Sequence, residues 1–131
     1  MNETTMPAPV YKILLFLKRK PGMTVEAFRD YYENTHSKLG ETHAHGLLRY
    51  IRRYLDPVGG EELPFDVVTE LWLRDRATAE AIADHVARNQ TPAEILEDEK
   101  QLFDRTKLRV AIAVEHESDL DQRLGEGSDG V

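Results

Sequence analysis

The sequence contains no cysteine, which excludes disulfide bonds, thiolate metal ligands and a nucleophilic thiol together. Any chemistry must therefore use oxygen or nitrogen groups. The longest apolar run, residues 13–17, is far too short to cross a bilayer, and the polar start MNETTMPAP lacks the basic-then-apolar pattern of a signal peptide. These absences predict a cytoplasmic protein that does not enter the membrane.

A concentrated basic segment is also missing. The net charge is −7, and the acidic stretch 115–129 carries most of the excess, so the rest of the chain is close to neutral. No basic face is available for a phosphate backbone, and we expect no nucleic-acid partner. Residues 117–131 are acidic and poor in apolar side chains, which predicts a mobile tail, and residues 1–9 are expected to be flexible.

Between these ends, residues 10–116 form one domain of ordinary size, with four segments that have the composition of strands. Residues 10–19 and 108–115 are apolar at both alternating positions, which is typical of strands covered on both faces. Residues 48–55 and 65–73 are separated by Asp-Pro and Gly-Gly turn signals, so we expect them to be antiparallel neighbours.

Three segments have helical spacing of their apolar residues. The first begins at the N-cap residue Thr24 and ends near Gly40, and the second spans 77–87. The third begins at the sequence TPAE, which offers Thr91 as N-cap, proline at the first helical position and glutamate at the third, and it is expected to run to about residue 104.

The order of these elements, βαββααβ, predicts an α+β fold of the ferredoxin-like split βαβ type. Its four-stranded antiparallel sheet would carry the helices on one face. Because the first and last strands are apolar on both faces, a second copy of the sheet is expected to cover the other face, making a homodimer. No internal repeat is visible.

Four blocks, in this order, resemble the EthD family of the dimeric α+β barrel superfamily: KRKPGMTVEAFRDYYENTHSKL, RYIRRYL, FDVVTELWL and ILEDEKQLFDRTKLRVAIAVEH. The resemblance covers residues 10–116. It implies a dimer with a ligand cavity in each subunit, usually between helices and sheet. Similar proteins include proteins encoded beside ether-degradation genes, lactone isomerases, and dehydratases or cyclases of aromatic polyketides. Most act without a cofactor, although more distant relatives bind haem.

His36 is the first candidate for chemistry. At about 100° per residue, Phe28, Tyr32 and His36 fall on one stripe of the first helix, so the histidine is expected to face the interior with the two aromatic residues as substrate contacts. An imidazole there exchanges protons near neutral pH. The alternative is a core histidine bonded to a backbone carbonyl. The resemblance favours catalysis, since the family has a histidine at this helix position.

Glu99 lies among apolar neighbours on the third helix. Its pKa would be raised unless it were paired, which makes it a candidate acid or a partner that orients His36. The alternative is a structural ion pair with Arg52 or Arg53.

Alternation along two neighbouring strands gathers polar and aromatic side chains: Tyr50, Arg52 and Tyr54 on one, Val68, Glu70 and Trp72 on the other. Among them we consider Tyr50, Arg52, Glu70 and Trp72 as substrate-binding residues, with arginine or tyrosine steadying an enolate. The same residues would equally suit a polar layer at the dimer interface.

The remaining histidines suggest metal chemistry only weakly. His43 and His45 form an H-x-H pair without a completing carboxylate, so no metal is expected. His85 flanks the apolar stripe of its helix and is a candidate haem ligand, although a solvated histidine explains it as well.

These observations lead to a cofactor-independent lyase or isomerase that acts on a small aromatic or lactone-like metabolite with His36 as proton shuttle. Two alternatives remain open at this stage: a small-molecule binding protein without catalysis, and an oxygenase that either binds haem or uses no cofactor.

Overall fold

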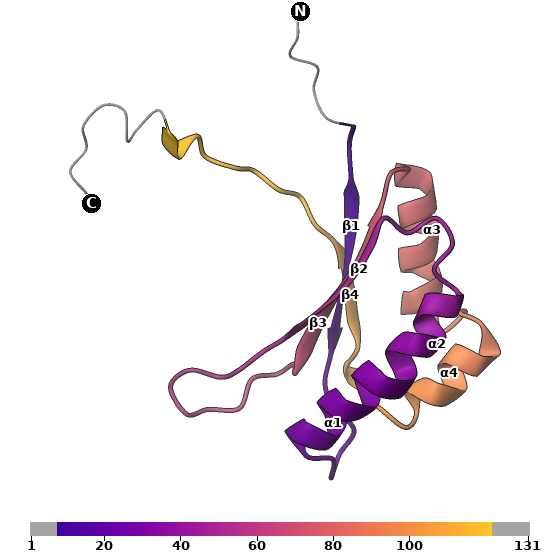
Figure 1. Cartoon of the computed structure of the whole chain (residues 1–131), viewed down its shortest axis with the longest axis vertical. Coiled ribbons are helices and arrows are strands. Elements are labelled where there is room, and N and C mark those ends of the chain that lie inside the picture. The colour runs from indigo at the N-terminus through magenta and orange to yellow at the C-terminus, as the bar shows by residue number, and fades with distance from the viewer. Residues whose placement is uncertain (1–7, 122–131) are drawn as a thin grey trace, which may run out of the picture.

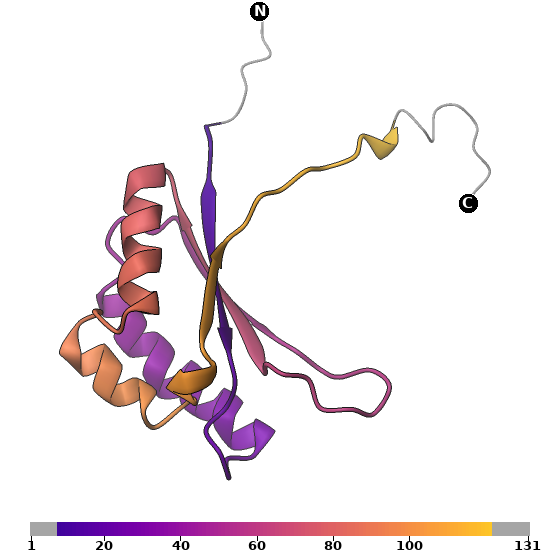
Figure 2. The same ribbon diagram turned by 180° about the vertical axis from the view of Figure 1, so that it is seen from behind.

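A computed structural model describes residues 8–121. In chain order the elements are β1 (Tyr11–Leu17), α1 (Val25–Tyr31), the π-helical η1 (Tyr32–His36), α2 (Ser37–Thr42), β2 (Arg49–Tyr54), β3 (Val67–Leu73), α3 (Arg76–Ala87), α4 (Ala93–Glu99), the 3₁₀ turn η2 (Arg105–Lys107) and β4 (Arg109–Ile112). The sheet order is β2-β3-β1-β4 and every pairing is antiparallel. The helices lie together on one face of the sheet (Figures 1 and 2). The predicted α+β architecture is confirmed.

The helix boundaries differ from the expected ones in three places. Thr24 caps α1 as predicted, because its hydroxyl accepts a hydrogen bond from the Ala27 N–H at 3.0 Å. The first helix then widens into η1, where the Ser37 N–H bonds to the carbonyl of Tyr32 five residues earlier. Thr91 does not cap α4, and that helix ends at Glu99 instead of continuing to residue 104.

The helix-facing side of the sheet carries the core. Strand alternation turns Ile13, Leu15 and Leu17 of β1 toward the helices, and Ile13 and Leu17 are almost completely buried. One cluster joins the Leu17 end of β1 to Phe28 and Tyr32, and a second joins Ile13 to α3. Between the two clusters the helices stand over the middle of the sheet, where the cavity described below is found.

The helices leave the other face of the sheet uncovered. Alternation places Leu14 and Phe16 of β1 and Glu70 and Trp72 of β3 on it. The β2–β3 connection and the segment after β4 both extend away from the helices on this side (Figures 1 and 2). From the connection, Phe65 packs against Phe16 with ring centroids 5.4 Å apart.

Within the part of the chain that is described, none of the helices is long and apolar enough to span a membrane. The flexible ends expected at 1–9 and 117–131 fall mostly outside the described residues, which begin at 8 and stop at 121.

Candidate functional site

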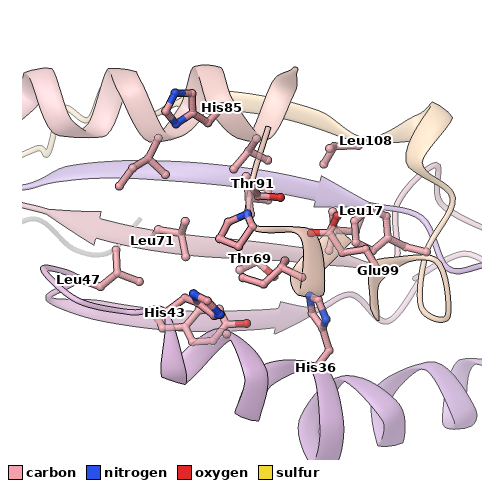
Figure 3. A pocket seen from close by; sticks show the side chains of 18 of the residues that line it. Leu17, His36, His43, Leu47, Thr69, Leu71, His85, Thr91, Glu99 and Leu108 are labelled. Atoms are coloured by element: carbon pink, nitrogen blue, oxygen red, sulfur yellow. The ribbon is translucent and has the colours of Figure 1, made fainter. Parts of the chain in front are cut away.

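A cavity of about 290 Å³ lies between the helices and the sheet (Figure 3). Leucines 15, 17 and 71 form its floor on the sheet, and Ile82, Val86 and Ile95 of α3 and α4 form its roof. Most of the lining is therefore apolar. A few polar side chains interrupt it, contributed by η1, by β2 and β3, and by the segment around α4. An apolar chamber with a few polar groups is the usual construction of a small-molecule site.

His36 stands on the wall of this cavity at the end of η1 (Figure 3). Only 6% of the residue is exposed. The following residue, Ser37, is buried as well, and its hydroxyl donates to the Glu33 carbonyl at 2.8 Å. The prediction that His36 faces the interior is confirmed. Single π-helical turns within α-helices are frequently found at functional sites.

The imidazole of His36 is held by one carboxylate. Its Nδ1 lies 2.8 Å from Oδ2 of Asp98 on α4, and the other oxygen of Asp98 accepts a hydrogen bond from the Tyr31 hydroxyl. That hydrogen bond is the main reason why the pKa of Tyr31 is raised to about 12. The phenol therefore stays protonated, and Asp98 is fixed from two sides.

Burial lowers the pKa of His36 below its ordinary value, and the carboxylate of Asp98 opposes that effect without overcoming it. The ring is therefore neutral at pH 7. A neutral ring with its proton on Nδ1 donates that proton to the carboxylate of Asp98 and leaves the lone pair on Nε2. Nε2 makes no hydrogen bond within residues 8–121 and belongs to a ring that lines the cavity. This is the arrangement of a general base held by an orienting carboxylate.

Glu99 also reaches the cavity and is buried, but it serves another contact. Its carboxylate pairs with Arg105, and the same guanidinium donates to the side chain of Asn89. The expected structural ion pair of Glu99 with an arginine is therefore present, but its partner is Arg105 and not Arg52 or Arg53. The carboxylate that orients His36 is Asp98, the neighbouring residue in the chain.

Hydroxyl groups gather where the helix-facing side of the sheet meets η1. The Tyr32 hydroxyl lies 2.6 Å from Oγ1 of Thr69, and both residues are almost completely buried. Burial raises the pKa of Tyr32 well above its usual value and also raises the pKa of Tyr50, so both phenols remain hydrogen-bond donors at neutral pH. All three residues line the cavity.

The other residues considered for substrate binding lie elsewhere. Phe28 is fully buried in the core and is not part of the cavity wall. Arg52 lies on the helix-facing side of the sheet, but its guanidinium donates two hydrogen bonds to the Glu33 carboxylate, at 2.9 and 2.8 Å. Glu70 and Trp72 share the uncovered face of the sheet, where the Trp72 indole N–H donates to Glu70 at 2.9 Å.

Two residues of the site were missed in the sequence. Asp98 lies three residues after Ile95 on α4, and this helical spacing predicts that it shares the inner face of the helix with Glu99. Thr91 was assigned to helix capping, a role that its sequence context favours. In the structure its Oγ1 is buried without a hydrogen-bond partner among residues 8–121, and the residue lines the cavity (Figure 3).

Three further histidines reach the cavity wall: His43, His45 and His85. His43 is tied to Glu94 in the first turn of α4, and His85 is exposed. Among the described residues no group of three or more histidine, aspartate or glutamate side chains is arranged to hold a metal ion.

Comparison with known proteins gives a family and a fold. The model of the EthD domain matches residues 20–106. Among solved structures, an ethyl tert-butyl ether D (EthD) family protein from Bacillus halodurans is similar with a TM-score of 0.53 and 21% sequence identity, over 82% of this chain and 98% of that one. No curated protein sequence matches this chain. At this identity the structural similarity supports the fold alone.

Proposed function

This chain belongs to the EthD family, and we propose that it is a lyase or isomerase that moves a proton on a small aromatic or lactone-like metabolite, using its own side chains. The observation that carries the proposal is His36 on the wall of an apolar cavity, bonded to the partly buried carboxylate of Asp98. Function varies widely within a fold, so this site, and not family membership, supports the assignment.

In the proposed reaction the lone pair of Nε2 of His36 removes a proton from a carbon next to a carbonyl group. The electron pair of the broken C–H bond moves onto the carbonyl oxygen and forms an enolate. The imidazolium then returns the proton, to a different carbon in an isomerisation or to a departing hydroxyl group in a dehydration. Asp98 stabilises the imidazolium at 2.8 Å without taking the proton itself.

The enolate oxygen needs hydrogen-bond donors. Tyr32 and Tyr50 line the same cavity, and their raised pKa values keep the phenols protonated. We assign them the stabilisation of the developing negative charge, which is most effective where water is excluded. Arg52 supports this group indirectly, since its guanidinium lies over the ring of Tyr50 at 4.8 Å.

The proposal includes a homodimer formed through the uncovered face of the sheet. Leu14 and Phe16 provide apolar surface there, while Arg53 and Glu70 provide both signs of charge, so that two copies of the face suit one another. The exposed side chains of Val58 and Val114 belong to the two segments that extend away from the helices on this side. We propose that a second copy of the chain covers them. The lack of cysteine fits action in the reducing cytoplasm.

The test is a metabolite screen with wild type and His36→Ala. We expect the variant to lose turnover while it remains folded at the assay temperature. A fully active His36→Ala variant would end the proposal. Recovery of a bound metabolite unaltered by wild type after long incubation would favour a binding protein instead.

A further inference from the structure

The cavity meets solvent at a group of polar side chains that the proposed mechanism does not use. Most of the residues that line the cavity are buried or half-buried, but five of them are exposed: His43, His45, His85, Gln90 and Pro92. We call these five residues the rim. They belong to the segment after α2, to α3 and to the α3–α4 loop. Figure 3 shows His43 and His85 on opposite walls of the cavity.

The rim carries hydrogen-bond donors that the described chain does not use. The ring of His43 is engaged, because its Nε2 contacts Glu94 in the first turn of α4. The rings of His45 and His85 and the side-chain amide of Gln90 make no hydrogen bond or ion pair within residues 8–121. These three side chains are therefore free to bind a group that comes from outside the protein.

The acidic residues around the rim already have their own cations. Those that neighbour the rim in the chain or contact the cavity pair as follows: Glu41 with Lys38, Asp84 with Arg88, Glu94 with His43, and Glu99 with Arg105. Imidazoles gain positive charge as the pH falls from about 8 to 5. Charge gained by His45 or His85 would thus have no carboxylate of this group to neutralise it, and the rim favours a ligand group of negative charge.

The interior of the cavity sets the rest of the ligand. Behind the rim the walls are mainly leucine, isoleucine and valine side chains, and the volume of about 290 Å³ exceeds the roughly 150 Å³ of a dry cavity that binds benzene. A negative group is costly to bury in such a space and keeps its hydration at the rim. Glu99 and His36 lie toward the Leu17 end of the cavity in Figure 3, so a deep anion would also approach the Glu99 carboxylate.

From these observations we propose that the rim binds a carboxylate group of the substrate, and that the substrate is a small organic acid with an apolar body. His45, His85 and Gln90 hold the carboxylate at the boundary with solvent, and the far end of the apolar body reaches His36. This deepens the proposed function by adding an acid group and an orientation, and it rests on that function only in taking this cavity as the substrate site.

The experiment is a fluorescence titration of the full chain with 2-naphthoate and with 2-naphthamide, an uncharged probe of the same shape. Both affinities are measured at pH 8 and at pH 6, a range in which the naphthoate stays ionised. In wild type we expect the preference for naphthoate over naphthamide to rise about threefold to tenfold from pH 8 to pH 6, the value of one or two exposed charge pairs.

Substitutions at the rim assign this rise to its histidines. His45→Gln and His85→Gln should each lose part of the rise, and the double variant should lose most of it, because glutamine keeps a donor but gains no charge. His116→Gln is the matched control, since His116 is exposed and does not line the cavity. Naphthamide should bind all of these variants as it binds wild type, which shows that the cavity is intact.

Salt supplies a second measurement, on wild type alone. Because the rim is exposed, about 1 M salt should bring the preference at pH 6 back toward its value at pH 8. A preference that is equal at the two pH values, or that rises as much in the double variant as in wild type, would overturn the proposal. A wild type that binds no naphthoate at either pH would overturn it as well.

A repeat of the titration in His36→Ala separates this inference from the proposed function. His36 also lines the cavity and gains charge in acid, but the rise in preference should persist without it. A rise that disappears in His36→Ala and persists in the double rim variant would assign the anion to His36 and refute the role of the rim. If His36→Ala retains turnover while the rim effect stands, the proposed mechanism fails and the acid class survives.

Discussion

The pair of His36 and Asp98 yields the sharpest prediction, because it can be examined without a substrate. The substitution Asp98→Asn removes the negative charge 2.8 Å from Nδ1 of His36 and leaves an amide of the same shape. An amide has a single acceptor oxygen, whereas the carboxylate serves both His36 and Tyr31. The protonated ring loses its counter-charge, while its burial remains.

The magnitude follows from the type of contact. Hydrogen bonds that involve a charged group contribute roughly 1.5–3 kcal/mol, and both side chains of this pair are largely shielded from solvent. Removal of the charge should therefore lower the proton-binding constant of His36 about tenfold to a hundredfold. Since burial already lowers the pKa of His36, the variant shifts it further in the same direction.

The assay is an NMR titration of the histidine ring nitrogens in ¹⁵N-labelled protein. In wild type the neutral ring should carry its proton on Nδ1, and in Asp98→Asn the midpoint of the His36 titration should move to lower pH. Tyr31→Phe is the matched control, because it removes the second donor to Asp98 and keeps the charge beside His36. An unchanged or higher midpoint in Asp98→Asn, or a wild-type ring protonated on Nε2, would refute the reasoning.

Three further outcomes are expected. Because the folded-state pKa of His36 lies below its ordinary value of 6.5, the unfolded chain binds more protons than the folded chain between these two values, and the free energy of unfolding should fall as pH falls through that window, by up to about 1.4 kcal/mol per pH unit. Urea unfolding at several pH values should show this slope in wild type and not in His36→Gln. Equal slopes in the two proteins would contradict the prediction. A Cβ at Gly40 would lie 2.8 Å from the Tyr50 hydroxyl, so Gly40→Ala should destabilise wild type. In the Tyr50→Leu background, where this clash is absent, the same substitution should stabilise the protein by about 1 kcal/mol through helix propensity. A double-mutant cycle by urea unfolding checks the change of sign. Leu14→Glu places a charge on the uncovered sheet face and should convert the proposed dimer to a monomer in sedimentation velocity, whereas an unchanged mass would remove that face from the interface.

The fold was predictable because its main signals are local. Alternation and turn residues located all four strands, and helical spacing located three helices on one side of the sheet. The face of each strand was not predictable in the same way. Tyr50 and Glu70 have similar polar and aromatic neighbours in their strands, yet the pairing of Tyr50 with Leu71 and of Ile51 with Glu70 puts them on opposite faces. Only the register decides this.

The candidate site was predictable in part for a related reason. His36 could be placed on the inner stripe of its helix from spacing alone, because Val25, Phe28 and Tyr32 before it define that stripe. The choice between Asp98 and Glu99 as its partner depends on the direction of α4 relative to η1, which is a tertiary property. Thr91 likewise does not cap α4, because that helix begins after Pro92, although local capping preference predicted that it would.

The π-helical turn η1 makes this site unequally tolerant of changes in chain length. A π-turn amounts to one extra residue within an α-helix, so it takes up that residue and lets the turns on either side keep their faces toward the sheet. Deletion of a single residue such as Asn34, which is exposed, would return η1 to a regular α-helical turn and leave the turns before and after it on the same faces. A further inserted residue would instead rotate the residues after it by about 100°. The contact between His36 and Asp98 is therefore more sensitive to an insertion in this helix than to the loss of one residue from η1.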